Sequence, residues 1–340
     1  MPLLGRLTEF VHGVRREALP ASFARIFDLA AGERAQFLPG YSRQSTVGER
    51  ISLEQRVADG LTNIRFSLYQ LYGSLCEWIS MESLETMLDS IGSTTELPIH
   101  HIRVLSEKCL FLIGQQHPAL LQRVLRILGM FFTHQARPLG ERAASSSSNS
   151  AKPSGNPLED DVVYHKQWLF YTKDVLTFIR TQVLEGVVWQ SQPFLLTSTV
   201  ELAAVILESG SNSIMSSRFL LSVVSVKGGE GEGEGVSLSF APSAETATVL
   251  HEAQLMAYGR LVYYLLFLGS STLAPREKET IAYMAAEAYI SYYPKLERGL
   301  ELARIPSDKV EELRTEMIFA NGLNMKRRKV KEKFLAWASS

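Results

Sequence analysis

The chain has 340 residues, of which 46% are apolar and 21% are charged, and its formal net charge is −1. This length and composition allow a sizeable core in one large domain or two ordinary ones, and they exclude wholesale disorder. The near-neutral charge argues against a general nucleic-acid binder, which would be basic overall. The two cysteines, Cys76 and Cys109, form no CxxC pair, so neither a zinc site nor a thioredoxin-like motif is expected.

The N-terminal part of the chain combines a basic start with a short turn. Residues 1–27 carry four arginines and are compatible with an amphipathic transit peptide, although Glu9 and Glu17 argue against one. A Leu-Pro-Gly turn follows at Leu38–Gly40 (Leu38, Pro39 and Gly40). Pro39 fixes φ and Gly40 supplies the conformational freedom that a tight turn requires, so we expect a structural role for these residues.

The apolar periodicity of the following segments is helical. Ile64, Leu68, Leu71, Leu75 and Ile79 recur at spacings of three and four, which predicts one buried helix face. The same spacing recurs further along the chain, at Leu120, Val124, Ile127 and Phe131. Two more helices are predicted over 275–290 and 306–319, each opened by a proline.

Two low-complexity stretches divide the chain into regions. Residues 143–160 include a Ser-rich, Pro-bearing segment that predicts a flexible linker between an N-terminal helical region, 1–142, and a C-terminal helical region, 161–340. The Gly/Glu-rich stretch 228–235 predicts a loop, and the Val–Ser alternation around it permits a short β-hairpin over 217–240. The predicted fold class is mainly α, a multi-helix bundle with membrane-associated apolar helices.

Three segments are apolar enough to be tested as membrane spans: 119–133, 186–207 and 255–273. A span needs about 20 predominantly apolar residues, and each segment is interrupted by charge (Arg123 and Arg126, Glu201, and Arg260, respectively). The periodicity favours core helices or in-plane interfacial helices over clean spans.

The residues expected to lie near a membrane come from the last two of these segments. In 186–207, a Trp–Pro–Phe cluster precedes the apolar run, and an indole ring is favoured at the membrane–water interface. Glu201 would have to face a partner helix, or be neutral, if the segment entered lipid. The membrane-proximal candidates are Trp189, Pro193, Phe194, Glu201, Tyr263 and Tyr264.

A basic run near the C-terminus holds six cations in eight residues: Lys326, Arg327, Arg328, Lys329, Lys331 and Lys333. Phe334, Leu335 and Trp337 follow it. Three interpretations stay open. The run is a solvated helix end, a contact for anionic lipid headgroups with the aromatic rings at the interface, or a nuclear address.

Catalytic signatures are not found: the sequence contains no P-loop, GxGxxG, HExxH or GxSxG motif. Residues 273–305 resemble the helical core of the alkylhydroperoxidase-D-like family. That family's two cysteines and histidine fall on Ser291, Pro294 and Arg298, which supply neither a thiolate nor an imidazole. That peroxidase chemistry is therefore excluded. The predicted function, set out below, involves no enzyme activity, no cofactor, no metal and no small-molecule substrate.

Several short motifs, taken in order along the chain, resemble the peroxin sixteen family of peroxisomal membrane proteins. They are the amphipathic start Leu7–Phe27, the turn Leu38–Gly40, a low-complexity insert between two halves, the Trp–Pro–Phe region of His165–Leu207 and the Leu-Val-Tyr-Tyr-Leu-Leu segment of Arg260–Ser270. Their order and spacing and the chain length agree with the family. The chain departs from it after Leu266, where Phe267, Leu268 and Gly269 replace an expected arginine.

The resemblance implies a membrane-bound docking protein of peroxisome biogenesis. Such a protein acts at the endoplasmic reticulum and the peroxisome, and it recruits peroxin three and, through it, membrane cargo bound to peroxin nineteen. The implied mechanism is docking by exposed apolar faces. The alternative is a soluble or peripheral helical scaffold subunit of a mitochondrial complex, which the Arg-bearing N-terminus favours.

Overall fold

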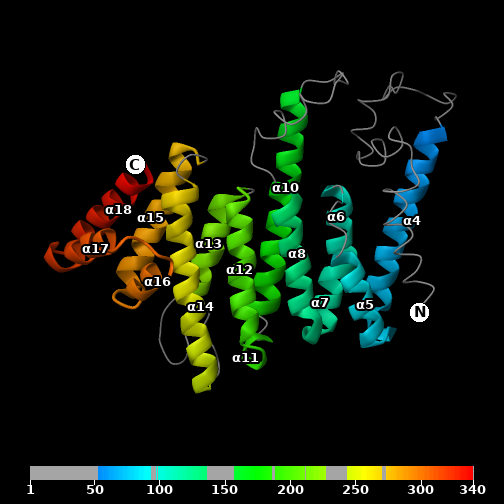
Figure 1. Ribbon diagram of the computed structural model, residues 1–340, viewed down its shortest axis with the longest axis horizontal. Helices are drawn as coiled ribbons and strands as arrows, with labels where there is room; N and C mark the ends of the chain where they lie inside the picture. Colours follow the sequence, from blue (N-terminus) through cyan, green and yellow to red (C-terminus); the bar gives the residue numbers. More distant parts are fainter. Residues whose placement is uncertain are drawn as a thin grey trace. The chain divides into compact units, whose positions relative to one another are not determined.

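The computed structural model describes residues 53–92, 97, 99–135, 157–185, 188–210, 212–226, 243–269 and 273–339. Over these residues the chain is mainly helical, as predicted, and it contains no strand (Figure 1). The segments Leu7–Phe27 and Leu38–Gly40, the loop 228–235 and most of the predicted linker lie outside the described residues.

The chain divides into two compact units, Met1–Tyr171 and Thr172–Ser340. The division falls within a long helix, α10 (Pro157–Ile179), whereas the sequence-based regions were separated at the linker 143–160. The last four residues of that linker, 157–160, already belong to α10.

The described part of unit 1 consists of helices. In chain order these are α4 (Leu53–Leu75), η1 (Cys76–Trp78), α5 (Met81–Gly92), α6 (Ile99–Leu105), η2 (Ser106–Leu110), α7 (Phe111–Gln116), η3 (Pro118–Leu120), α8 (Leu121–Gln135) and the first part of α10.

Helix α4 is present where the apolar spacing predicts it, but its buried face agrees with the predicted one only in part. Ile64 and Leu71 are 46% and 40% exposed, whereas Arg65, Tyr69 and Tyr72 are buried. The buried face packs against α6 and η2. The predicted face is therefore confirmed at Leu68 and Ile79 and wrong at Ile64 and Leu71, where cationic and aromatic side chains one position further along the helix lie in the core.

Helix α8 confirms the other predicted face: Leu120, Val124, Ile127 and Phe131 are all buried. A buried polar contact joins η2 to α10 in the core of unit 1. The Ser106 hydroxyl lies 2.9 Å from the Tyr171 hydroxyl, and both side chains are buried.

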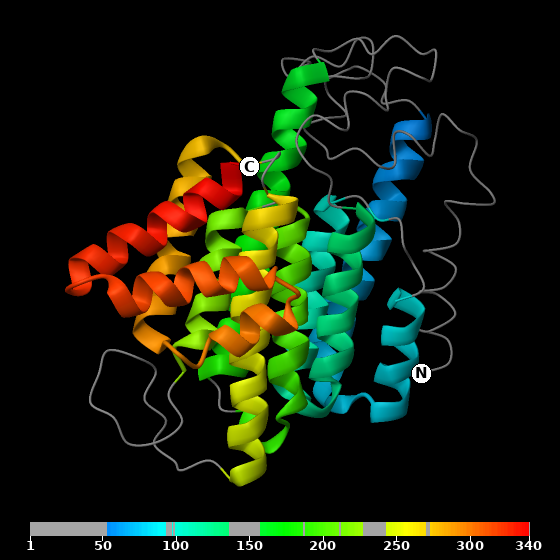
Figure 2. The same cartoon turned by 60° about the vertical axis from the view of Figure 1, so that its left-hand side comes forward.

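Unit 2 begins with the remainder of α10, from Thr172. Its elements in chain order are η4 (Arg180–Glu185), α11 (Val188–Ser191), α12 (Phe194–Glu208), α13 (Ser213–Val224), α14 (Ala244–Tyr263), η5 (Tyr264–Leu268), α15 (Pro275–Tyr292), α16 (Glu297–Leu302), α17 (Ser307–Phe319) and α18 (Leu323–Ser339). Helices α12, α13 and α14 pack against one another, and α15 packs against α13 and α18 (Figure 2).

The predicted β-hairpin over 217–240 is wrong in its first arm, because residues 217–224 belong to helix α13. Asn212 caps this helix, and its side chain accepts a hydrogen bond from the Met215 amide at 3.2 Å. The serines that produced the alternating pattern donate to carbonyls of their own helix, as Ser217 does to Ser213 at 2.6 Å. The second arm, 236–240, lies outside the described residues.

Two glycines allow the backbones of α14 and α16 to come into direct contact. A Cβ atom on Gly259 would collide with the Gly299 carbonyl oxygen, and a Cβ on Gly299 would lie 2.6 Å from the Leu255 carbonyl oxygen. Neither position has room for any larger residue unless a helix moves. The contact fixes the spacing of these two helices.

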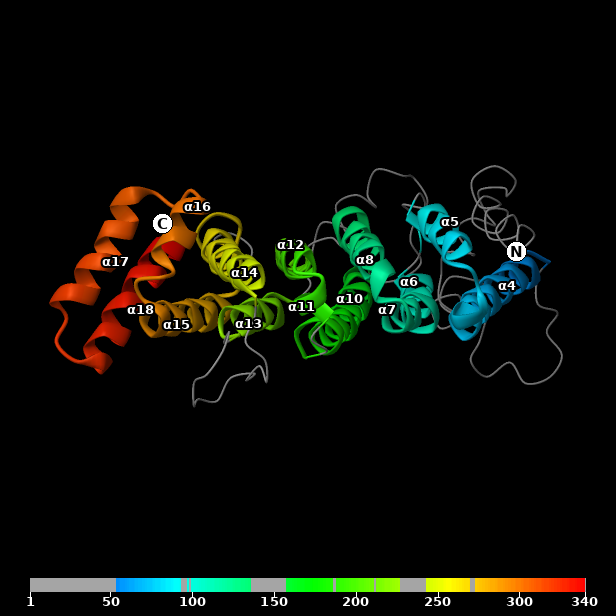
Figure 3. The same cartoon turned by 90° about the horizontal axis from the view of Figure 1, so that it is seen from below.

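Helices α17 and α18 form an antiparallel hairpin whose turn lies at the outer end of unit 2, away from α12 (Figure 3). Gly322, in the turn, has φ of +81°, a conformation that glycine adopts without steric cost. The predicted helices over 275–290 and 306–319 are confirmed as α15 and α17.

The apolar segments do not form membrane spans in the described part of the chain: none of the helices there is both long and apolar enough to cross a bilayer. Segment 186–207 ends in α12, a helix of 15 residues whose buried face carries Leu196, Val200 and Leu207. The sequence allowed segment 186–207 to be either a membrane span or a core helix. In the structure, α12 is a core helix of unit 2.

Candidate functional site

The Trp–Pro–Phe cluster does not form an exposed interfacial belt. Trp189 is fully buried, so its indole ring is a core group and is not available at a membrane surface. Pro193 directly precedes α12 and is half-buried, and Phe194, the first residue of that helix, is exposed. Glu201 is exposed, so it lies on the solvent-facing side of a helix whose other side is in the core.

The two adjacent tyrosines have different environments. Tyr264 is buried, and its hydroxyl lies 3.0 Å from the Ser213 hydroxyl, which makes it a packing residue between η5 and α13. Tyr263 is half-buried, with its ring centroid 5.0 Å from that of Phe267. The structure therefore does not bring Tyr264 to the surface beside Tyr263.

The basic run lies on α18, and most of its cations are paired with carboxylates of the same unit. The pairs between helices are Arg327 with Glu287 at 3.1 Å, Lys331 with Glu279 at 2.8 Å and Lys333 with Glu312 at 3.0 Å. The hydrogen bond from Lys331 lowers the pKa of the Glu279 carboxyl group. These pairs attach α18 to α15 and α17, so half of the run serves the packing of the hairpin.

The aromatic side chains after the run also face inward. Phe334 and Trp337 are buried, with ring centroids 5.4 Å apart. The Lys309 ammonium of α17 lies 5.4 Å from the Trp337 ring centroid. Of the three open interpretations, the one that places these aromatic rings at a lipid interface is therefore wrong for Phe334 and Trp337, because both rings are buried.

The exposed apolar side chains gather instead at the turn of the same hairpin. Ile318 and Phe319 end α17 and are 61% and 75% exposed, and Leu323 and Met325 begin α18 and are 54% and 41% exposed. We call these four residues the apolar tip. Four large apolar side chains within eight residues form a patch, unlike the scattered single apolar residues that are normal on protein surfaces.

Cations border the apolar tip. Lys326, the next residue along the chain, forms no ion pair with any described residue. Arg328 and Lys329 contact Glu332 of their own helix at 3.3 and 4.0 Å. Pairs between exposed side chains of one helix are weak and exchange readily with solvent or other anions. The tip thus combines an apolar surface with adjacent cations.

Sequence reasoning located the basic run but missed the apolar tip. The signal was present: Ile318-Phe319 and Leu323 flank the helix-breaking Ala-Asn-Gly. What the sequence did not reveal is that the turn projects, so that these side chains find no partner elsewhere in the unit.

Comparison with known proteins gave no match to any family model, curated protein or solved structure.

Proposed function

We propose that this protein docks at a membrane surface through the apolar tip and acts there as a recruitment scaffold. The observation that carries the proposal is the exposure of Ile318, Phe319, Leu323 and Met325 on one projecting turn beside Lys326. Transfer of apolar side chains into the boundary between lipid headgroups and acyl chains lowers the free energy, and flanking cations are attracted to anionic headgroups.

The size of the effect follows from the exposed side chains. Full burial of a Phe or Leu side chain is worth about 1.5–3 kcal/mol. Phe319 is 75% exposed and can contribute most of that amount. Each cation close to an anionic surface adds about 1 kcal/mol. Together these terms support reversible, peripheral attachment.

We extend the proposal to the peroxisomal membrane on the strength of the sequence resemblance to the peroxin sixteen family. In this role the chain recruits peroxin three and, through it, peroxin nineteen-bound membrane cargo, with the apolar tip holding it at the bilayer.

The membrane contact is tested by co-sedimentation of the full-length protein with phosphatidylcholine vesicles, with and without phosphatidylserine. Phe319→Ser should lower the partition coefficient about tenfold, because tenfold corresponds to roughly 1.4 kcal/mol. Lys326→Glu should reduce binding to the phosphatidylserine vesicles more than binding to neutral ones.

The matched control is Trp78→Ser, which removes the most exposed large apolar side chain of the described residues, 81% exposed and located in unit 1. It should leave vesicle binding unchanged. An equal loss from Trp78→Ser and Phe319→Ser, or no loss from Phe319→Ser, would remove the apolar tip from the proposal. Both positions are exposed, so the thermal unfolding midpoint should stay constant in each variant.

The organelle is tested with a fluorescent fusion and carbonate extraction of isolated membranes. A peroxisomal signal that carbonate releases is the expected result. A mitochondrial signal that is lost when residues 1–27 are deleted would instead establish the scaffold alternative. Recovery of all of the protein in the soluble fraction after gentle lysis would contradict membrane docking altogether.

A further inference from the structure

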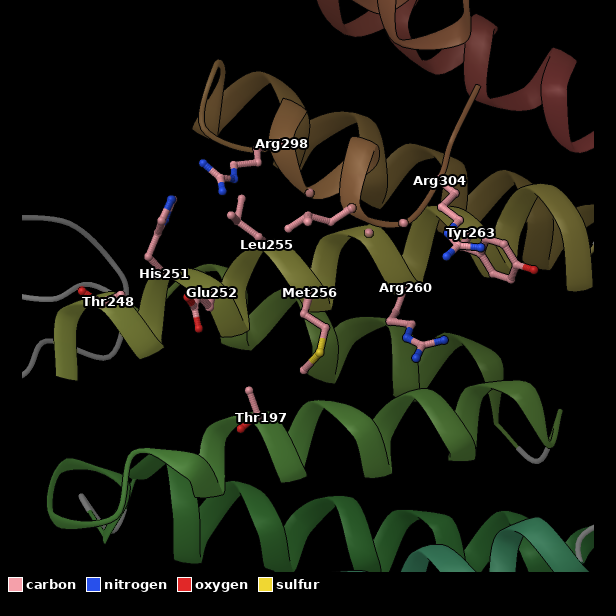
Figure 4. A pocket seen from close by; sticks show the side chains of 14 residues that line it. Thr197, Thr248, His251, Glu252, Leu255, Met256, Arg260, Tyr263, Arg298 and Arg304 are labelled. Carbon is pink, nitrogen blue, oxygen red and sulfur yellow. The ribbon is translucent and has the colours of Figure 1, made fainter. Parts of the chain in front are cut away.

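Unit 2 contains a groove that the membrane-docking proposal does not use. It lies between α12, α14 and α16 and has a volume of about 860 Å³ (Figure 4). Small-ligand sites occupy about 300–1,000 Å³. Along α14 the groove runs from Thr248, past His251, to Tyr263. The last two residues are twelve positions apart, about 18 Å on a helix.

The middle of the groove is apolar. Leu255, Met256 and Gly259 of α14 line it on one side, and Leu302 and Ala303 line it on the other. Leu302 is 62% exposed although it borders this concave surface. The close approach of Gly259 to Gly299 sets the separation of the two helices that line the groove. An apolar chain lying along α14 would cover this surface.

The charged side chains of the groove are mainly cationic: three arginines, one glutamate (Glu252) and one histidine line it. Arg260 is 3.8 Å from Glu208, a long and exposed pair. Arg298 and Arg304 form no ion pair with any residue that the structure describes. Guanidinium groups bind carboxylate and phosphate groups through paired hydrogen bonds.

The arginines are distributed along the groove. Arg304 and Arg260 lie at the end marked by Tyr263, and Arg298 lies towards the end marked by His251, with Leu255 and Met256 between them (Figure 4). The end near Tyr263 therefore gathers two guanidinium groups and a phenol hydroxyl, which suits a compact anionic head group.

Arg304 occupies a backbone position that normally favours glycine. Its φ is +58°, and it lies two residues after the end of α16, directly after the C-cap residue Ala303. Its amide donates to the Glu301 carbonyl at 2.9 Å, and the Ile305 amide donates to the Leu300 carbonyl at 3.0 Å. Glycine is the usual residue at this point of a helix C-terminus. A side chain kept in a left-handed conformation is characteristic of functional sites.

From these observations we infer that the groove binds a single-chain anionic amphiphile. The head group contacts Arg304 and Arg260, and the apolar chain lies over Leu255, Met256 and Leu302. The head group is a carboxylate, as in a free fatty acid, or a phosphate monoester, as in lysophosphatidic acid. The inference does not rest on the proposed membrane docking, because the groove and the apolar tip share no residue.

The test measures binding of two anionic probes, oleate and oleoyl-lysophosphatidic acid, to the full-length protein below their micelle-forming concentrations, with monoolein as the neutral probe. Both anionic probes should bind more tightly than monoolein, and the tighter of the two identifies the head group. Equal binding of monoolein would overturn the inference.

Arg304→Gly separates this role from a structural one. The substitution should raise the midpoint of thermal unfolding, because glycine relieves the left-handed backbone, and should weaken binding of the anionic probes at least tenfold. The matched control, Arg218→Ala, removes an exposed arginine of α13 that does not line the groove, and it should leave binding unchanged.

Leu302→Asp places a carboxylate on the apolar side of the groove at an exposed position and should also abolish binding of the anionic probes. Phe319→Ser, which disrupts the apolar tip, should preserve it. Unchanged probe affinity in Arg304→Gly and Leu302→Asp would refute the inference that the amphiphile binds in the groove, whatever the outcome of the vesicle experiment.

Discussion

The contact between α14 and α16 gives the sharpest test of the packing argument. We expect Gly299→Ala to destabilise unit 2, although alanine is the better helix former. The added Cβ would lie 2.6 Å from the Leu255 carbonyl oxygen and 3.2 Å from the Leu255 Cα. Ordinary contact begins at 3.4 Å, so the helices must separate by about 0.8 Å to relieve the closer contact.

Both obstructing atoms belong to the backbone and cannot rotate away. Overpacking of this kind costs about 1–3 kcal/mol, whereas replacing an internal helical glycine by alanine gains up to about 1 kcal/mol. With the full propensity gain of about 1 kcal/mol, the expected net change is a loss of about 0–2 kcal/mol in the free energy of unfolding.

The measurement is urea unfolding followed by circular dichroism at 222 nm, fitted with separate transitions for the two units if they are resolved. Gly60→Ala is the control, because Gly60 lies inside α4 and a Cβ there meets no atom within 4 Å. This variant should gain about 0.5–1 kcal/mol. If Gly299→Ala were stabilised as much as Gly60→Ala, the close-contact argument would fail.

Three further outcomes concern buried side chains. Burial raises the pKa of the Tyr258 phenol, which donates to the Ala285 carbonyl at 3.0 Å. Above pH 10 the unfolded state loses this proton and the folded state keeps it, so stability should fall with rising pH, by up to about 1.4 kcal/mol per pH unit for this group. In a pH series of urea unfolding, Tyr258→Phe should flatten that decline, and an unchanged slope would contradict the assignment. Burial also raises the pKa of the Cys109 thiol, so iodoacetamide at pH 8 should label it only after denaturation, and rapid labelling of the native protein would refute its burial. Tyr171→Phe leaves the buried Ser106 hydroxyl without its partner and should cost about 1–3 kcal/mol in urea unfolding, whereas a neutral result would mean that this hydrogen bond adds nothing to stability.

Local patterns sufficed to predict the helical class and several element positions. Proline at the first turn, with an acid close behind, placed the start of α15, where the Glu277 carboxylate accepts the Ala274 amide at 3.0 Å. The three-and-four spacing of α8 identified its buried face, since this helix is buried over a wide surface and several choices of face are correct. These features depend on residues less than two turns apart.

Local patterns failed where the outcome depended on distant partners. The face of α4 was misassigned at Ile64 and Leu71, because Arg65 and Tyr69 find buried surroundings that their own segment does not encode. The alternation of α13 suggested strand pairing because serine hydroxyls that bond their own helix are indistinguishable, in sequence, from solvent-facing strand residues.

The candidate sites show the same division. The sequence by itself determined that the chain is helical, that its apolar segments are interrupted by charge, and that six cations gather near the C-terminus. The tertiary structure decided which of these groups are available. It buried Trp189, paired Lys331 with Glu279, and left Phe319 exposed. Availability depends on what covers a side chain, and the covering residues come from helices far away in the sequence.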